Sequence, residues 1–149
     1  DNINVINSIL VAKSKSIEIS EVKHQKQSEY QTCIKLTVIT DKQSRSVSGT
    51  LFAGKPRIVE IKGIEIDAGL SAHNLYISNE DKPGFIRDLS KVLADNKINI
   101  GTFNLGRKNS GGEAVALVST DSKIEEAVIE SIKKIPLVIQ AKYLSFDEQ

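Results

Sequence analysis

The sequence predicts an α+β protein in two parts, of which the second has the ferredoxin-like element order βαββαβ. Two observations predict the second part: from residue 72 to residue 146 the apolar spacing switches between that of a strand and that of a helix, and a turn-rich loop precedes the first helix. A third observation predicts the first part, where short alternating stretches are separated by turn residues, as in an antiparallel sheet. Residues 67–71 are the best boundary, so we expect a small antiparallel α+β domain over residues 1–69 and a ferredoxin-like domain over residues 70–149.

The first part opens with a helical pattern. Apolar residues recur at helical spacing over residues 1–13, on a face wide enough that this helix needs a partner surface. Residues 16–20 alternate and predict either a short strand or an extended lead-in, and the polar residues 21–29 predict a loop.

Four strands are predicted next, and they cover residues 30–40, 46–52, 57–61 and 64–66. The first of them places Ile34, Leu36 and Val38 on one face. Lys62 and Gly63 are a two-residue hairpin signal between the last two strands. With one helix to cover them, these strands predict a thin antiparallel layer.

The second part alternates strands and helices. We expect strand 75–78, helix 83–95, strand 99–106, strand 113–119, helix 122–134 and strand 137–146. Helical spacing predicts the buried faces of the two helices, which are Phe85, Leu89, Val92 and Leu93 in the first and Ile124, Val128, Ile132 and Ile135 in the second. Ser122 and Glu125 fit a capping box that would begin the second helix, and Pro136 would stop it.

The strand over residues 113–119 has no polar residue from Ala114 to Val118, which predicts a central strand that helices cover on one face. If its other face is apolar as well, that face also needs a cover. A second copy of the domain is the simplest way to cover that face, so we expect the chain to self-associate through this domain.

The loop over residues 79–84, with the sequence NEDKPG, carries the functional information. Asp81 can cap the following helix, Pro83 suits a first helical turn, and Gly84 lets a ligand come close. A helix N-terminus attracts small anions, and Asn99 opens the next strand with a side chain that both donates and accepts. The pattern indicates a pocket for a small amino acid; an ordinary capped turn that binds nothing is the alternative.

Composition excludes several classes of partner. The 20 basic and 19 acidic residues nearly cancel and form no long run of one sign, which argues against nucleic acid bound by bulk charge. No apolar run approaches a membrane span, and no signal-peptide pattern is present. The single cysteine, Cys33, cannot form an internal disulfide, which suits the cytoplasm. Because the chain opens with Asp1 and has no methionine, we expect a piece of a longer protein.

No constellation for catalysis is recognisable. His24 and His73 are far apart and lack ligands at metal-binding spacing, so no metal site is predicted, and Cys33 has no activating neighbour and is expected to pack in a strand. Residues 101–108 imitate the glycine spacing of a P-loop but place Arg107 where lysine is required. The dinucleotide fingerprint G-x-G-x-x-G is absent. We therefore expect no catalytic residue and no cofactor in this chain.

Several motifs together resemble a known pair of domains. The loop over residues 79–84, with KINI at residues 97–100 and GGEA at residues 111–114, is similar to an ACT domain, a module by which enzymes of amino-acid metabolism sense amino acids. Residues 47–52 and 62–67 resemble the allosteric substrate-binding domain that precedes the ACT domain in bacterial long-form D-3-phosphoglycerate dehydrogenases. In that family the domain begins further upstream with a strand and a helix, so the resemblance implies that residues 1–69 are part of such a domain. The resemblance covers essentially the whole chain.

This resemblance implies a regulatory role. In that family L-serine is held by the loop before the Pro-Gly pair and by an asparagine that opens the second strand. By motif position it implies that Asn79, Asp81, Gly84 and Asn99 bind L-serine or a similar small amino acid. Some members have His or Tyr in place of Asn79 and Asn in place of Asp81. The family also implies homo-oligomers formed through ACT domains, and upstream catalytic domains of an oxidoreductase of L-serine biosynthesis that use NAD.

Arg45, Lys55 and Arg57 cluster near the predicted hairpin ends of the first part. The domain that this part resembles is thought to bind substrate or phosphate, so these three side chains are candidates for holding a phosphorylated effector. A solvated basic rim is the alternative.

Two other functions have some support in the sequence. The ACT-containing subunit of an iron–sulfur L-serine dehydratase has a similar GGEA segment, although this chain lacks the cysteines of a cluster. The ferredoxin-like order is also that of an RNA-binding module, which stacks bases on aromatic side chains of its central strands. Residues 111–118 contain no aromatic residue, and Tyr76 and Phe103 are the only candidates, so we expect no nucleic-acid partner.

Overall fold

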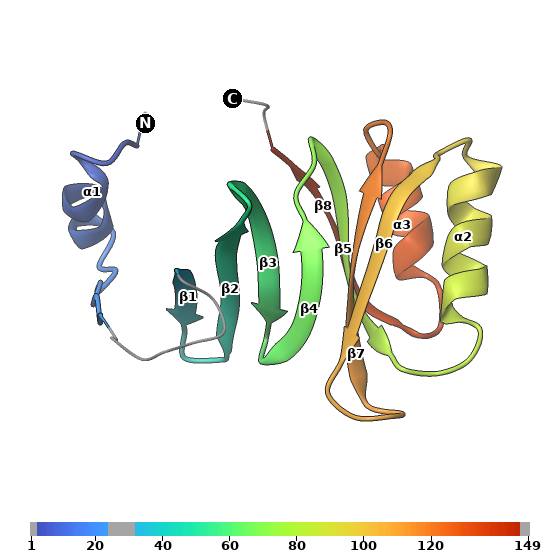
Figure 1. Ribbon diagram of the computed structural model, residues 1–149, viewed down its shortest axis with the longest axis horizontal. Coiled ribbons are helices and arrows are strands. Elements are labelled where there is room, and N and C mark those ends of the chain that lie inside the picture. Colours follow the sequence, from blue (N-terminus) through green and yellow to red (C-terminus); the bar gives the residue numbers. More distant parts are fainter. Residues whose placement is uncertain (1–2, 24–31, 147–149) are drawn as a thin grey trace.

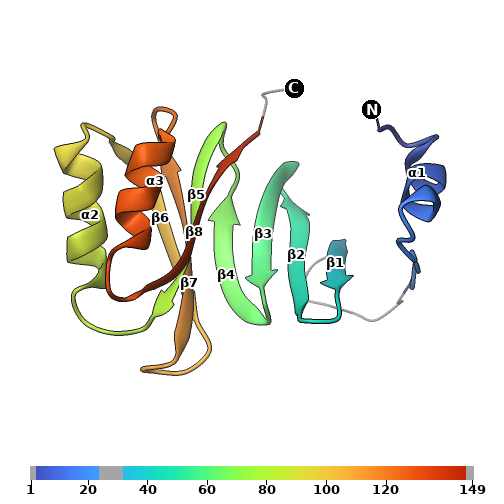
Figure 2. The same ribbon diagram turned by 180° about the vertical axis from the view of Figure 1, so that it is seen from behind.

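The computed structural model describes residues 3–23 and 32–146. Within these residues it contains two four-stranded antiparallel sheets and three helices, which confirms the predicted α+β class. The two sheets and the helices α2 and α3 form successive layers, with the first sheet and the helices on opposite sides of the second sheet (Figures 1 and 2).

The first part consists of α1 (Ser8–Ser14), β1 (Cys33–Ile39), β2 (Ser44–Phe52), β3 (Lys55–Ile61) and β4 (Ile64–Gly69). The four strands are neighbours in chain order, as predicted for a meander. Lys62 and Gly63 both have positive φ, at 56° and 74°, and Ile61 pairs with Ile64, so the predicted two-residue hairpin is confirmed.

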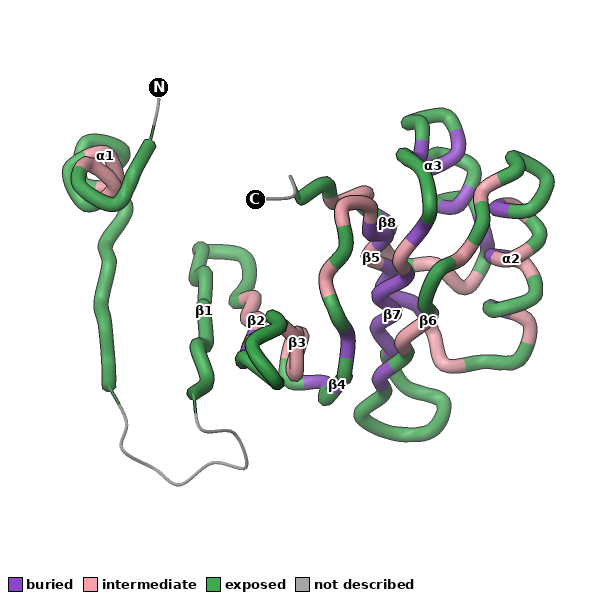
Figure 3. Tube along the Cα trace, turned by 45° about the horizontal axis from the view of Figure 1, so that its top comes forward, coloured by how far each residue is buried: buried purple, intermediate pink, exposed green. Residues whose placement is uncertain are grey.

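The helix α1 is shorter than predicted and has no buried residue. It begins at Ser8, and in the turn in front of it Asn4 Oδ1 accepts the backbone N–H groups of Ile6 and Asn7. It lies apart from both sheets (Figure 3). Residues 16–20 form no strand. The predicted loop over residues 21–29 and the start of the strand predicted from residue 30 fall largely outside the described residues.

The second part consists of β5 (His73–Glu80), α2 (Phe85–Asp95), β6 (Ile100–Arg107), β7 (Glu113–Thr120), α3 (Glu126–Lys133) and β8 (Val138–Ser145). This is the predicted βαββαβ order. The strands lie in the order β6-β7-β5-β8, so β7 is an interior strand, as its apolar sequence predicted.

The core of the second part lies between its sheet and its two helices. The predicted helix faces are buried: Phe85, Leu89 and Leu93 are at most 2% exposed, and Ile132 is fully buried. Val92 packs against this core but is only partly buried. Leu75, Ile77, Ala116, Val118 and Ala141 contribute the sheet side.

The predicted capping box of the second helix is wrong. α3 begins at Glu126, and its N-cap residue, Glu125, makes no side-chain capping bond. The hydroxyl of Thr120 donates to the carbonyl oxygen of Ser122 at 2.8 Å and holds the preceding segment in a turn instead. Ile124 is 2% exposed, so burial of this side chain fixes the segment before the helix starts.

The outer face of β7 is covered by the chain itself and not by a second copy. Val115 and Leu117 form a second apolar cluster with Ile64, Ile66 and Ala68 of β4. β4 runs beside β6, where the Asn104 side chain donates to the carbonyl oxygen of Asp67 at 2.7 Å. The expectation that a second copy covers this face is therefore wrong, since β4 occupies it.

Candidate functional site

The loop between β5 and α2 combines a buried polar side chain with a helix N-terminus. Asn79 is 1% exposed and, by strand alternation, lies on the face of β5 that carries Leu75 and Ile77 toward the helices. Its Nδ2 donates to the carbonyl oxygen of Glu80 at 2.8 Å. Its Oδ1 is buried and has no hydrogen-bond partner among the residues that the structure describes. A buried acceptor without a donor costs about 1–3 kcal/mol, so this atom is suited to a donor group from outside the chain.

Asp81 does not cap α2. One carboxylate oxygen accepts Arg107 Nη1 at 3.0 Å and the Gly111 N–H at 3.2 Å. The Asp81 N–H donates to the carbonyl oxygen of Gly112 at 2.8 Å. Asp81 therefore fastens the loop to the β6–β7 hairpin, and a ligand's ammonium group would share a carboxylate that already has two donors.

The N-terminus of α2 is built on glycine. Gly84 is the N-cap residue, with φ at 107°, a conformation that side chains other than glycine rarely adopt. No side-chain capping bond is made at this end, so the first N–H groups of the helix remain available to an anion. Asp88 in the first turn pairs with Arg87, whose Nε donates at 2.8 Å.

Asn99 lies at the other end of the second sheet. Asn79 pairs with Ala114 at the start of β7, whereas Ile100 pairs with Thr120 at its end. Six residues of a strand separate these positions by about 20 Å. The Asn99 side chain donates to Asp121 at 2.6 Å. Asn79, Asp81 and Gly84 thus lie within six residues of one another along the chain, whereas Asn99 of the same chain lies at the far end of the sheet.

The pKa of the Asp81 carboxyl depends on its contact with Arg107. The side-chain hydrogen bond from Arg107, followed by the backbone bond from Gly111, lowers the pKa of Asp81 below its ordinary value. Because the pKa is lower in the folded state, the contact stabilises the fold above the unfolded pKa of about 4 and is lost as the pH falls through the folded pKa. We expect Arg107→Gln to raise the pKa of Asp81, as measured by NMR titration of its carboxyl carbon. Lys108→Gln is the matched control, and an unchanged pKa in Arg107→Gln would contradict the contact.

The three basic residues of the first part do not gather in one place. Arg45 is near the start of β2, whereas Arg57 pairs with Thr50 near its other end. The Nε of Arg57 forms an ion pair with Asp67 at 2.5 Å, and Lys55 lies at the β2–β3 hairpin. The structure thus separates Arg45 from the other two predicted residues.

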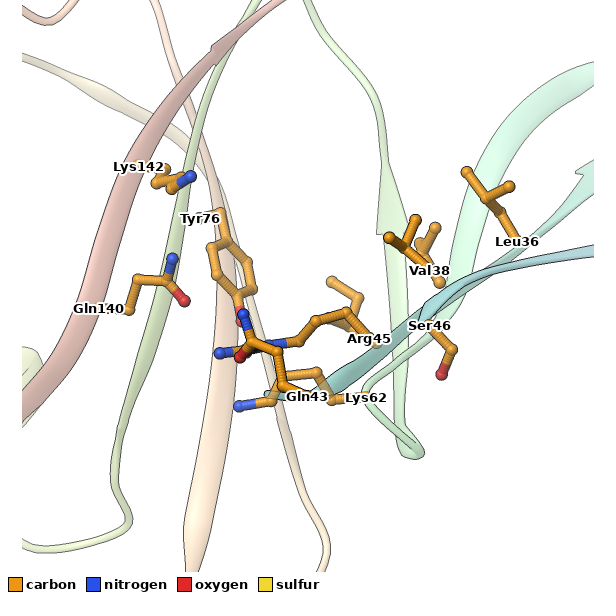
Figure 4. A pocket seen from close by; sticks show the side chains of 11 residues that line it. Leu36, Val38, Gln43, Arg45, Ser46, Lys62, Tyr76, Gln140 and Lys142 are labelled. Atoms are coloured by element: carbon orange, nitrogen blue, oxygen red, sulfur yellow. Dashed lines mark hydrogen bonds between the residues drawn. The ribbon is translucent and has the colours of Figure 1, made fainter. Parts of the chain in front are cut away.

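A pocket of about 340 Å³ lies where the two sheets diverge, and we call it the wedge pocket. It is lined by Leu36, Val38, Gln43, Arg45, Ser46, Val47 and Ile61 of the first sheet, by Lys62 of the β3–β4 turn, and by Tyr76, Gln140 and Lys142 of the second sheet. In Figure 4 the polar ends of Gln43, Arg45 and Lys62 gather near the hydroxyl end of Tyr76. Sequence reasoning found Arg45 but missed Lys62 and Lys142, because only the packing of one sheet against the other brings them together.

A second pocket, of about 520 Å³, follows the same face of the first sheet. Its walls are mostly aliphatic and include Ile34, Leu51, Ile58 and Leu70. Arg57 also lines this pocket, but its guanidinium is paired with Asp67. The pocket therefore offers a mainly apolar surface.

The histidine and cysteine side chains of the described part of the chain form no metal or nucleophile cluster. No group of three His, Cys, Asp or Glu side chains there could hold a metal ion. His73 is paired with the Tyr143 hydroxyl at 2.6 Å, and His24 falls outside the described residues. Cys33 is exposed, contrary to the expected packing role. No helix in residues 3–23 and 32–146 is long and apolar enough to cross a membrane.

Both described sheets are antiparallel. Dinucleotides such as NAD bind at the carboxyl ends of parallel strands, beside a glycine-rich turn. The described residues therefore do not fit an NAD site of that type.

Two family models match the chain. The D-3-phosphoglycerate dehydrogenase intervening domain matches residues 1–62, and the ACT domain matches residues 73–137. The two matches follow the two parts of the structure.

The chain is also similar to longer curated proteins. It is 34% identical to the D-3-phosphoglycerate dehydrogenase of Bacillus subtilis (strain 168) over 143 residues, which is 95% of this chain and 27% of the relative. It is 36% identical to the protein of the same name from Methanocaldococcus jannaschii, over 90% of this chain and 25% of the relative. The probable L-serine dehydratase, beta chain, of Bacillus subtilis is 26% identical over 89% of this chain and 61% of the relative. The chain thus spans about a quarter of the dehydrogenase relatives.

Proposed function

This chain carries the intervening domain and the ACT domain of the D-3-phosphoglycerate dehydrogenase family, and from that premise we propose that it is the regulatory region of such an enzyme and senses L-serine. In this proposal the chain performs no chemistry itself. Catalytic domains in the rest of the protein bind NAD and oxidise the substrate in L-serine biosynthesis, in the cytoplasm.

The unpartnered Oδ1 of Asn79 is the observation that carries the proposal. The Asp81 carboxylate follows it along the chain, as does the N-terminus of α2, which begins after Gly84 and has no side-chain capping bond. An amino acid offers the matching groups: its ammonium donates to oxygen atoms, and its carboxylate suits free N–H groups at a helix N-terminus. Because Asn79 is 1% exposed, a ligand reaches it only when the residues that cover it move, which couples binding to a local conformational change.

The position of Asn99 supports a site shared by two chains. Its side chain lies about 20 Å along the sheet from Asn79 of the same chain, by the strand register. A second copy that packs in the opposite direction would bring its own Asn99 to the loop of the first. The outer face of β7 is occupied by β4, so such pairing would use the edges of the sheet or the helices.

Regulation would then follow from linkage. If L-serine binds one arrangement of the paired ACT domains more tightly than another, it shifts the population toward that arrangement. The catalytic domains attached to the favoured arrangement would be less active. The effector can shift the equilibrium only by its difference in affinity for the two arrangements.

Calorimetry with L-serine tests the proposal. We expect saturable binding that Asn99→Ala weakens by about tenfold or more, because a charge-assisted hydrogen bond to the ligand contributes about 1.5–3 kcal/mol. Asn96→Ala is the matched control, since Asn96 donates to the Val92 carbonyl oxygen at the end of α2 and lies outside the site. Binding that is absent, or unchanged by Asn99→Ala, would refute the site, and equal binding of D-serine would refute specific recognition.

The alternative is the ACT-containing subunit of an iron–sulfur L-serine dehydratase. The probable L-serine dehydratase, beta chain, matches along most of the chain, at lower identity than the two dehydrogenases. Purification of the full-length protein distinguishes the dehydrogenase from the dehydratase. NAD-dependent dehydrogenase activity in the purified protein supports the dehydrogenase. A copurifying subunit that contains an iron–sulfur cluster supports the dehydratase.

A further inference from the structure

An ion pair joins the two parts of the chain near the attachment of the ACT loop, by which we mean residues 79–84. Lys62 lies in the β3–β4 turn, and its ammonium pairs with the carboxylate of Glu113 at the start of β7. Among residues 3–23 and 32–146 this is the one ion pair between the first part and the second. The two side chains are 21% and 39% exposed, so solvent ions screen this pair less than a fully exposed one.

The carboxylate of Glu113 has a second donor in the strand that leads into the ACT loop. Its Oε1 accepts both the Lys62 ammonium and the Ser78 hydroxyl, the latter at 2.5 Å. These two hydrogen bonds lower the pKa of the Glu113 carboxyl, so it stays ionised at neutral pH. Ser78 directly precedes Asn79 in β5, and alternation along the strand turns Ser78 toward the first sheet and Asn79 toward the helices. Two successive residues thus serve the ion pair and the candidate effector site.

The ACT loop is tied to the same end of β7. The Asp81 N–H donates to the carbonyl oxygen of Gly112 at 2.8 Å, and the Gly111 N–H donates to the Asp81 carboxylate at 3.2 Å. Gly112 directly precedes Glu113 in the chain. A continuous set of contacts therefore runs from Asp81 through residues 111–113 to Lys62 of the first part.

Binding at Asn79 requires a movement close to these contacts. Asn79 is 1% exposed, and the register of β5 against β8 shifts between Ser78 and Asn79, which makes the strand irregular at this point. When the ACT loop takes part in the movement, it either carries residues 111–113 along or breaks its own hydrogen bonds to them. The first course strains the ion pair to Lys62, and the second loses the bonds at Asp81.

We propose that the ion pair between Lys62 and Glu113 restrains the ACT loop, so that the first part of the chain opposes effector binding. The proposal rests on the proposed function in taking the ACT loop as the effector site. Because coupling between two sites is reciprocal, an effector that displaces the loop weakens the contact between the two parts by the same factor. The position of the first part thereby sets how readily the second part responds to its effector.

Hydrogen exchange of backbone amides in the ligand-free 149-residue chain, followed by NMR, tests the restraint. In Lys62→Gln we expect the Asp81 amide to exchange at least about threefold faster, because loss of a partly exposed ion pair lowers the cost of local opening. The Ile98 amide is the internal control, since it donates to the Leu93 carbonyl oxygen at the end of α2. Equal acceleration at Ile98 would report a general loss of stability and overturn the proposal.

Two further variants separate this ion pair from a change in charge. Glu113→Gln removes the same ion pair from the other side and should accelerate exchange of the Asp81 amide as Lys62→Gln does. Lys35→Gln makes the same change in charge as Lys62→Gln, but it breaks an ion pair with Glu60, at 2.7 Å, that lies within the first sheet. The proposal requires acceleration in the first two variants and none in Lys35→Gln, and any other pattern would overturn it.

Calorimetry and NMR with L-serine test the link to the effector. We expect Lys62→Gln to bind L-serine about threefold more tightly than the original chain, because less energy is needed to open the loop. In the original chain, L-serine should move the amide signals of Lys62 and Gly63. Binding that is equally tight in the two chains, or signals that stay in place, would overturn the link. If no chain bound L-serine, the proposed function would fail, and the ligand-free exchange would still decide whether the ion pair restrains the loop.

Discussion

Replacing Leu89 by alanine is expected to lower the free energy of unfolding of the second part by about 2–5 kcal/mol. Leu89 is fully buried between α2 and the sheet. The substitution removes apolar contacts and leaves a cavity that the neighbouring strands can only partly fill. Since domains of this size are stable by about 5–15 kcal/mol, the loss is a large fraction of the total. Urea denaturation followed by circular dichroism measures it.

The matched control for this prediction lies on the same helix. Ile86 is 51% exposed, so Ile86→Ala removes a side chain of equal size that contributes little to the core. We expect it to change the free energy of unfolding by less than about 0.5 kcal/mol. Equal losses in the two variants would mean that α2 does not pack as described.

Replacing Gly106 by alanine is expected to disrupt the contact between the two parts. A Cβ atom at this position would overlap the carbonyl oxygen of Glu65 in β4 and lie 3.1 Å from Cγ2 of Ile64. The carbonyl belongs to the backbone and cannot turn aside, so β4 has to move away from β6. We expect a loss of about 1–3 kcal/mol in stability, together with faster amide hydrogen exchange in β4.

Gly69→Ala is the control for the contact at Gly106. Gly69 also lies in β4, but a Cβ atom there would have no other atom within 4 Å. We expect this variant to stay within about 0.5 kcal/mol of the original chain. If Gly106→Ala left exchange in β4 unchanged, the close approach of β4 and β6 would be refuted.

The elements of the second part were predictable because their signals are local. Leu89 and Leu93 have the spacing of a buried helix face, and the apolar run of residues 114–118 marks an interior strand. Both signals depend on neighbours in sequence. The hairpin at Lys62 and Gly63 was predictable for the same reason, since glycine readily adopts the positive φ that both positions have in this two-residue turn.

The features that were missed depend on contacts between distant residues. Asp81 has the chemistry of a helix cap, but Arg107 and Gly111 compete for its carboxylate from the next hairpin. Asn99 follows the expected motif, yet only the strand register shows that it lies far from Asn79. The cover of Val115 and Leu117 by β4 could not be read from an apolar strand, because any apolar partner satisfies the same pattern.

The packing of β4 against β7 also determines where the chain can be truncated for experiments. A fragment that begins at residue 70 would keep every element of the ferredoxin-like unit but would expose Val115 and Leu117 to water, inviting aggregation. A fragment that begins before Ile64 would retain the strand that shields them. Truncation experiments on the ferredoxin-like unit should therefore keep this strand, or replace the two shielded side chains by polar ones.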